Sequence, residues 1–340
     1  MSGRSRKLIM DWFSKGPVQI VLGIVFSVTF GWFAVSGINW SSVWSQTLNL
    51  PMLLGLLALL LFLGVGVIRA YRWQMLFIQD RVSVRRLFLV QNIGLGVSSL
   101  VPIRLLSEVT QFALLRWRYR VSGGTTIVTF GLERLFDLIV TATLLLVGLA
   151  LVPNMGDLVP YGLGILMIVI VSIFLVRIFS WASSKPYFNR FPVIASLAAS
   201  LSDLVGAKGN LAFIFFLTLS YWTLIGIAAW VIAFGMNLGI SPFMATVVII
   251  GTIYMATFVP SLPTALGTFE FAIVYVLKLF GVQQDVAFSY ALIMHVLLFL
   301  PPIVITLGSL PLIGLREIKE CKQPEHIDKI SGMAIKGDLF

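Results

Sequence analysis

The sequence has few charged residues, a single cysteine and only two histidines. Asp, Glu, Lys and Arg make up 11% of its 340 residues and hydrophobic residues 59%, whereas about a quarter of a soluble domain is charged. The mean hydropathy is +0.99. These values exclude a soluble enzyme and a disordered chain, and one cysteine excludes an intrachain disulfide framework. Because the apolar runs are continuous rather than alternating, we predict an all-α polytopic membrane protein.

The sequence also lacks the common catalytic motifs. We find no phosphate-binding P-loop, no HExxH or GxSxG motif and no metal-ligand spacing of Cys and His. We therefore expect no enzyme, no cofactor and no metal. The net charge of +10 is typical of basic residues beside membrane spans, so we expect no nucleic-acid partner.

Apolar stretches predict about six full transmembrane helices and two broken ones. The six continuous stretches cover residues 18–37, 51–68, 125–152, 160–181, 211–235 and 286–313. The stretch 87–115 is interrupted by Pro102, and 243–283 is interrupted by Pro260, Pro263 and Gly267. We predict one transmembrane domain over 1–315, followed by a polar cytoplasmic tail over 316–340.

The basic residues predict the topology. Lys and Arg gather in the N-terminal segment, at 69–86, 116–120 and 182–210, and in the tail, but the connections 38–50, 153–159 and 236–242 have none. The positive-inside rule then places both termini in the cytoplasm, at the cell membrane. It makes 87–115 and 243–283 re-entrant hairpins that enter the membrane from opposite faces. The alternative is that each of these stretches crosses the membrane as two tilted full spans.

This order of elements repeats along the chain. Two spans, a hairpin and a span cover 18–152, and the same order covers 160–313. Each half contains an odd number of full crossings, so the halves have opposite orientations. The pattern is that of the inverted repeats of transporters, whose sites lie near the midplane where helices are broken.

Six ionisable residues lie inside the apolar segments and are candidate site residues, because such groups are expensive in a bilayer. They are Arg104, Glu108, Glu133, Arg134, Asp137 and Glu270. Arg134 and Asp137 are three residues apart and can pair along one helix. The guanidinium of Arg104 suits a phosphate group. The other interpretation is a structural ion-pair cluster, in which Arg104 bonds Glu133 or Asp137.

Two further polar residues have a structural and a functional interpretation. Asn92, near Gly94 and Gly96, suits close helix packing, with a role in a polar substrate site as the alternative. His295, alone on an apolar helix, suits a satisfied core position, with a proton relay as the alternative.

Five segments together carry a family resemblance. They are RAYRWQMLF at 69–77, Asn92, VPIRLLSE at 101–108, ERLFDL at 133–138 and PTALGTFEFA at 263–272. In their order and spacing, the chain resembles the transmembrane region of lysylphosphatidylglycerol synthases and the wider flippase-like domain family. The aminoacyl-transferring domain of the synthases has no counterpart in these 340 residues. The resemblance implies movement of an anionic or isoprenoid-linked lipid between leaflets, with the six ionisable residues at the site.

We therefore expect a lipid translocase whose partners are membrane lipids with an anionic headgroup. The sequence is compatible with an oligomer and does not determine the oligomeric state. In this hypothesis Arg104 and Arg134 hold the phosphate, and Glu108, Glu133 and Asp137 pair with them when no lipid is bound. Glu270 serves the opposite hairpin and titrates if transport is coupled to protons. The alternatives are a membrane enzyme acting on lipid-linked substrates and a scaffold subunit.

Overall fold

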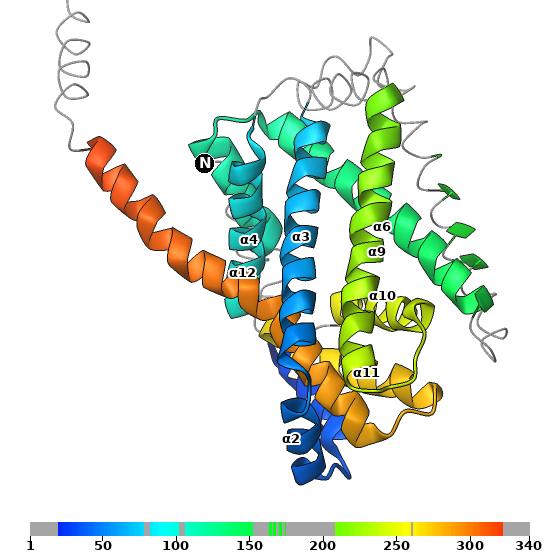
Figure 1. Ribbon diagram of the computed structural model, residues 1–340. Helices are drawn as coiled ribbons and strands as arrows, with labels where there is room; N and C mark the ends of the chain where they lie inside the picture. Colours follow the sequence, from blue (N-terminus) through cyan, green and yellow to red (C-terminus); the bar gives the residue numbers. More distant parts are fainter. Residues whose placement is uncertain are drawn as a thin grey trace, which may run out of the picture.

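The computed structural model describes residues 20–77, 82–101, 106–151, 208–259 and 261–321, and a few single residues between 163 and 174. All regular secondary structure in these ranges is helical (Figure 1). The first helix in the described part of the chain is Ile20–Val35. The following elements are α2 (Trp40–Leu48), α3 (Met52–Leu76), α4 (Val84–Leu100), α5 (Leu106–Ala113), the π-helix η1 (Leu114–Arg118), α6 (Gly123–Leu151), α9 (Lys208–Gly235), α10 (Pro242–Phe258), the 3-10 turn η4 (Pro263–Ala265), α11 (Thr268–Leu279) and α12 (Gln284–Cys321).

Helices α3 and α9 form an antiparallel pair at the centre of the bundle (Figure 1). The Cα of Gly235, at the end of α9, lies close to Leu50 and Leu54, at the start of α3. At the other end of the pair, Arg72 of α3 bonds Thr218 of α9. This antiparallel arrangement gives the bundle two ends. We call the end where α3 finishes and α9 starts the basic end, because Arg85, Arg86, Arg116 and Arg118 lie there; the opposite end is the α2 end.

The first hairpin starts and finishes at the basic end. Helix α4 begins shortly after α3 ends, and α5 packs back along α4. The guanidinium carbon of Arg86, near the start of α4, lies 5.4 Å from the centroid of the ring of Tyr119, which follows η1. Val101 adopts an extended conformation, with φ −127° and ψ 132°, as expected for a residue before proline. The hairpin 87–115 therefore returns to the end of the bundle where it starts, as predicted, and re-entry rather than two tilted full spans stays a prediction.

The second hairpin starts and finishes at the α2 end. Ser241 caps α10 by accepting a hydrogen bond from the amide of Met244 at 3.2 Å, and Pro242 occupies the first turn, where no amide donor is needed. At the C-terminal end of the hairpin, just after α11, Phe280 packs against the first part of α10. Gln284 then donates to the carbonyl of Ser36 at 2.9 Å. The two hairpins therefore enter from opposite ends, as the charge pattern predicts.

The break in the second hairpin is a tight, packed turn. Thr264 and Ala265 have φ of 59° and 58°, which is a strained conformation for residues with a Cβ. The amide of Leu262 donates to the hydroxyl of Ser27 at 2.8 Å. The turn η4 also contacts α4 of the first hairpin. The break of the second hairpin therefore lies between α4 of the first hairpin and the helix Ile20–Val35.

Helix α12 contacts both hairpins. Its first part packs on α2 and α11, and its later part packs on α4, where the hydroxyl of Thr306 donates to the carbonyl of Asn92 at 3.0 Å. Gly96 permits this approach, since a Cβ there would lie 2.6 Å from the carbonyl oxygen of Pro302. Cys321 belongs to α12, so the first six residues of the predicted tail, 316–321, continue the helix; the rest of the tail lies outside the described residues.

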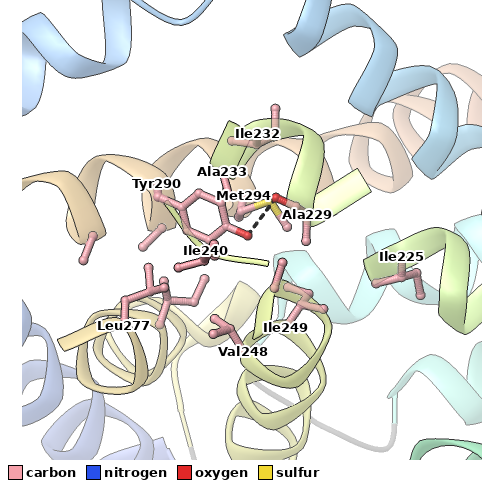
Figure 2. Close-up of a cluster of buried hydrophobic side chains, with 14 of the residues drawn as sticks. Ile225, Ala229, Ile232, Ala233, Ile240, Val248, Ile249, Leu277, Tyr290 and Met294 are labelled. Carbon is pink, nitrogen blue, oxygen red and sulfur yellow. Dashed lines mark hydrogen bonds between the residues drawn. The ribbon is translucent and has the colours of Figure 1, made fainter. Parts of the chain in front are cut away.

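The largest buried apolar cluster lies towards the α2 end and joins α9, α10, α11 and α12. Figure 2 shows its centre, where Ile232 and Ala233 of α9 pack near Met294 of α12. The hydroxyl of Tyr290 donates to the carbonyl of Ala229 at 3.0 Å, so the one polar group in this centre has a partner. The second hairpin is therefore held in a continuous core.

The described helices agree with a membrane protein. By length and composition, three of them can cross a membrane: Met52–Leu76, Leu211–Gly235 and Gln284–Ser309. A fourth span is possible if Ile20–Val35 and α2 count as one, although they are bent by 86°. Part of the predicted connection 38–50 is therefore helical. Helix α6 matches the predicted span 125–152 but carries three charged residues, and the predicted span 160–181 lies largely outside the described residues.

Candidate functional site

Arg72 is the centre of a buried polar cluster between α3, α6 and α9. Its side chain is fully buried. One terminal nitrogen, Nη1, donates to Asp137 Oδ1 at 2.5 Å and to the Thr218 hydroxyl at 3.3 Å. The other, Nη2, donates to Glu133 Oε1 at 2.8 Å. One guanidinium thus ties together three helices that are far apart in the sequence.

Asp137 has partners from two further side chains, both on α9. The hydroxyl of Tyr221 donates to its Oδ1, and the indole of Trp222 donates to the same oxygen at 3.4 Å. The ring of Tyr221 also lies 5.0 Å from the guanidinium carbon of Arg72, in a cation–π arrangement. The charges are therefore balanced and both terminal nitrogens of Arg72 have partners, as a buried ion pair requires, whereas its buried Nε has no hydrogen-bond partner among the described residues.

Arg69 completes the cluster from one turn earlier on α3. Its Nε donates to Glu133 Oε1 at 3.1 Å, and its side chain is 24% exposed. Two arginines thus face two carboxylates, and the cluster has no net charge. From the sequence, Arg69 and Arg72 are predicted to be basic residues that set the topology outside the span 51–68, because the apolar run ends there. Helix α3 instead continues to Leu76 and carries both side chains into the bundle.

Arg134 belongs to a separate contact between the first hairpin and α6. Its Nη2 donates to Glu108 Oε1 at 2.7 Å, and the two side chains are 62% and 37% exposed. The pairing of Arg134 with Asp137 along α6 is wrong: Asp137 points to α3 and α9, whereas Arg134 points to α5. The carboxylates of Glu133 and Asp137 take Arg69 and Arg72 as partners, where Arg104 had been considered. Arg104 itself lies outside the described residues.

Asn92 is placed at the contact between α4 and α12. Its side-chain amide donates to the carbonyl of Phe88 at 2.8 Å, one turn earlier on the same helix. Its backbone carbonyl accepts the hydroxyl of Thr306. The structure therefore brings Asn92 into helix packing and does not bring it to the acidic and basic side chains above.

Glu270 forms a second polar site, in the second hairpin. Its Oε2 accepts the amide of Gly267 at 2.7 Å, and its Oε1 lies 2.5 Å from Nδ1 of His295 on α12. A contact between Glu270 and His295 is not among the predictions made from the sequence. A signal was present, because an acid and a histidine inside apolar segments each need a polar partner. Among the described residues, no group of three His, Cys, Asp or Glu side chains can hold a metal ion.

The candidate residues therefore fall into three places. Glu133 and Asp137 lie in the buried cluster, Glu108 and Arg134 form an exposed ion pair, and Glu270 pairs with His295 at the other hairpin. The cluster suits a static joint, since every charged group in it is neutralised by its neighbours. The Arg134–Glu108 pair is open to a ligand. Whether any of these residues binds a substrate stays a prediction.

Comparisons with known proteins agree with this architecture. The family model for the lysylphosphatidylglycerol synthase TM region matches residues 20–306. The chain is also 27% identical over 275 residues to a UPF0104 membrane protein of Methanothermobacter thermautotrophicus, which covers 72% of this chain and 78% of that protein. The region matched by the family model, 20–306, includes all the helices described above except the end of α12. The chain therefore belongs to the family of the lysylphosphatidylglycerol synthase transmembrane region.

Proposed function

We propose that this membrane protein moves a lipid with an anionic, phosphorylated headgroup between the two leaflets. The lipid would be an anionic phospholipid or an isoprenoid-linked lipid. The observation that carries the proposal is the exposed Arg134–Glu108 pair, which lies beside a buried and neutral charge cluster inside a bundle of apolar helices.

The position of Arg134 argues for a polar ligand. It lies eleven residues after the start of α6, which corresponds to about 16 Å along the helix at 1.5 Å per residue. A charged pair at such a depth is expensive when acyl chains surround it. Its exposed side is therefore best matched by water or by a lipid headgroup that has entered between α5 and α6.

The chemistry of the pair suits exchange with a phosphate. Among the described residues, the Arg134 guanidinium donates only through its Nη2, to Glu108, which leaves its other donors for a second oxygen. A phosphate group can accept two parallel hydrogen bonds from one guanidinium. In our proposal the phosphate replaces Glu108, and Glu108 returns when the lipid leaves. Arg104, four residues before Glu108 in the sequence, would supply a second guanidinium.

The buried cluster would keep Arg134 in place. Glu133 is adjacent to Arg134 in α6 and is held by Arg69 and Arg72 of α3. This fixes the rotation of α6 about its axis and directs Arg134 towards α5. In this proposal Glu133 and Asp137 are positioning residues, and Asn92 positions α4 against α12.

The two opposed hairpins supply the change of access. Breaks in helices at the interface of inverted repeats commonly form transporter sites. Here the break of one hairpin contacts the other, so a movement of either hairpin would open the centre towards one face. We propose transport rather than catalysis, in the cell membrane, with the basic end and both termini in the cytoplasm, where basic side chains attract anionic lipids.

The test is lipid movement in vesicles that contain the purified protein. Fluorescent phosphatidylglycerol is the probe, fluorescent phosphatidylcholine is the comparison, and dithionite bleaches only the label in the outer leaflet. We expect the parent protein to expose the inner phosphatidylglycerol to dithionite. Arg134→Ala should slow this at least about tenfold, because a hydrogen bond to a charged group contributes about 1.5–3 kcal/mol.

Lys278→Ala is the matched control, since Lys278 is a cation at the α2 end that bonds only Gln284 among the described residues. It should leave the rate unchanged. If Arg134→Ala and Lys278→Ala move the label as fast as the parent, Arg134 does not hold the headgroup. If the parent moves neither lipid, the translocase proposal fails.

A further inference from the structure

The Glu270–His295 pair is buried in the second hairpin, away from the arginine cluster. The side chain of Glu270 is 5% exposed and that of His295 is 13% exposed. Their facing atoms, Oε1 and Nδ1, are 2.5 Å apart, a distance at which one hydrogen lies between them. The pair joins α11 to α12 across the contact that closes this hairpin.

Aromatic side chains surround the imidazole. The ring of Phe269 meets it edge to face at a centroid distance of 5.3 Å, and the ring of Phe299 lies at 4.7 Å. Phe269 is itself 1% exposed. The two rings and the burial of Glu270 keep bulk water away from one side of the pair, so its net charge has little screening.

The described parts of the elements packed against α11 and α12 bring no other charge to the pair. Lys278 lies eight residues after Glu270 and Asp285 ten residues before His295, so each is more than two helical turns away, towards the α2 end. There Lys278 bonds Gln284, and the carboxylate of Asp285 accepts the amide of Asn39. The arginines of α3 bond Glu133 and Asp137, and Arg85 and Arg86 of α4 are exposed at the basic end. The remaining ionisable groups with described side chains on these elements are tyrosines: Tyr71, Tyr221, Tyr254, Tyr275 and Tyr290.

Counting protons shows what this isolation implies. A carboxylate beside an imidazolium has no net charge, and so does a carboxylic acid beside a neutral imidazole. Removing one proton from either form leaves a charge of −1 with no cation nearby. A lone charge is expensive in such surroundings, so the pair binds one proton as a unit.

The same carboxylate also holds the break of the hairpin. The second oxygen of Glu270 accepts the amide of Gly267. Gly267 has φ +83°, and a Cβ there would lie 2.2 Å from the carbonyl oxygen of Ser27. A change in the charge of Glu270 would therefore act at once on α12, on the break and on the helix Ile20–Val35.

We propose that Glu270 and His295 form a proton-binding site and that lipid movement is coupled to a proton passing through it. The proton comes from water on one side and returns to water on the other, and no electron moves. Protonated, the pair holds α11 on α12; deprotonated, the unpaired carboxylate favours separation of the hairpin and entry of water. This inference rests on the proposed translocase function for its transport step, but the proton site itself can be tested alone.

The direct test is nuclear magnetic resonance of the protein labelled with ¹⁵N in its histidine rings, in lipid nanodiscs at pH 7. The chain has two histidines, so a His326→Ala background leaves the Nδ1 and Nε2 signals of one ring, that of His295. We expect a ring that shares its Nδ1 proton with Glu270, and a neutral imidazole in Glu270→Gln, where no carboxylate can balance a cation. An identical signal in both proteins would overturn the proton site.

The coupling test uses vesicles with and without a pH gradient of one unit. For each coupled proton, such a gradient supports up to about a tenfold difference in label between leaflets at steady state. The parent and Lys278→Ala should build up this difference, and Glu270→Gln should not. If the parent moves the label but distributes it equally, coupling is wrong and the translocase proposal stands. If no label moves, the translocase proposal fails, and the ¹⁵N signals still decide the proton site.

Discussion

Replacing Arg72 by methionine should destabilise the protein more than any other single change of a charged residue described above. Arg72→Met keeps most of the side-chain volume but removes three hydrogen bonds, at 2.5, 2.8 and 3.3 Å, from a fully buried group. Among the described residues, the carboxylate of Asp137 then keeps only Tyr221 and Trp222 as hydrogen-bond partners. Breaking one side of a buried ion pair costs about 3–5 kcal/mol, because the remaining charge has no counterpart.

Arg69→Met provides the comparison. Arg69 is on the same helix, makes one ion pair with the same Glu133 oxygen at 3.1 Å, and is 24% exposed. A partly exposed pair of this kind contributes about 0–1 kcal/mol. The two variants remove the same charge and nearly the same side chain, so the difference in unfolding free energy between them, about 2–5 kcal/mol, measures the effect of burial.

The assay is the free energy of unfolding in bicelles, determined by steric trapping, with the thermal midpoint in one detergent as a second readout. Arg72→Met combined with Asp137→Asn should be more stable than Arg72→Met alone, by about 0.5–3 kcal/mol, because the charge balance of the cluster is restored. Equal stabilities of Arg72→Met and Arg69→Met would refute the buried cluster as the joint between α3, α6 and α9.

Three further changes test the packing of the hairpins, with unfolding free energy as the readout. Gly96→Ala places a Cβ 2.1 Å from a hydroxyl of α12 and should destabilise by about 1–3 kcal/mol, whereas Gly131→Ala, with no neighbour within 4 Å, should change stability by at most about 1 kcal/mol. Gly267→Ala forces a Cβ onto a residue at φ +83° and should destabilise by at least about 1 kcal/mol; a stable variant would show that the break relaxes freely. Tyr254→Phe removes the 2.5 Å bond to a threonine of α6 and should destabilise by about 1 kcal/mol; no change would mean that α10 and α6 are held by apolar packing alone.

The sequence predicts the path of the chain well because hydropathy and basic residues report it directly. Pro102 and Pro260 mark both breaks, and arginines on either side of 87–115 require a return to the same face. These are local signals, readable without knowing which helices touch. The bend of 86° between Ile20–Val35 and α2 is missed, since a run of apolar residues does not show where a helix turns at Gly37.

The partners of the charged side chains are predicted poorly because they depend on tertiary contacts. Arg134 and Asp137 satisfy the spacing for a pair within one helix, but they point to different neighbours. Arg72 follows an apolar run and reads as a topology signal, although the helix continues past it. Which arginine meets which carboxylate is decided by the antiparallel packing of α3 on α9, and the sequence of one helix does not contain that information.

The two hairpins use the same arrangement of charge, which links the candidate site to the fold. Glu108 and Glu270 are each the third residue of the helix that follows a break. Each pairs with a basic side chain on the next long helix, Arg134 or His295, at separations of 26 and 25 residues. The helices that lead into the breaks, α4 and α10, both have 17 residues.

The long helices also cross over between the hairpins in the same way. Helix α12 packs on α4 and helix α6 packs on α10, each with a threonine hydroxyl at the contact. This correspondence between the two halves supports the inverted repeat that the order of spans and hairpins predicts. The two pairs differ in one respect: arginine always carries its charge, whereas a histidine can release a proton. In our two proposals, the carboxylate contact therefore serves a headgroup in the first hairpin and a proton in the second.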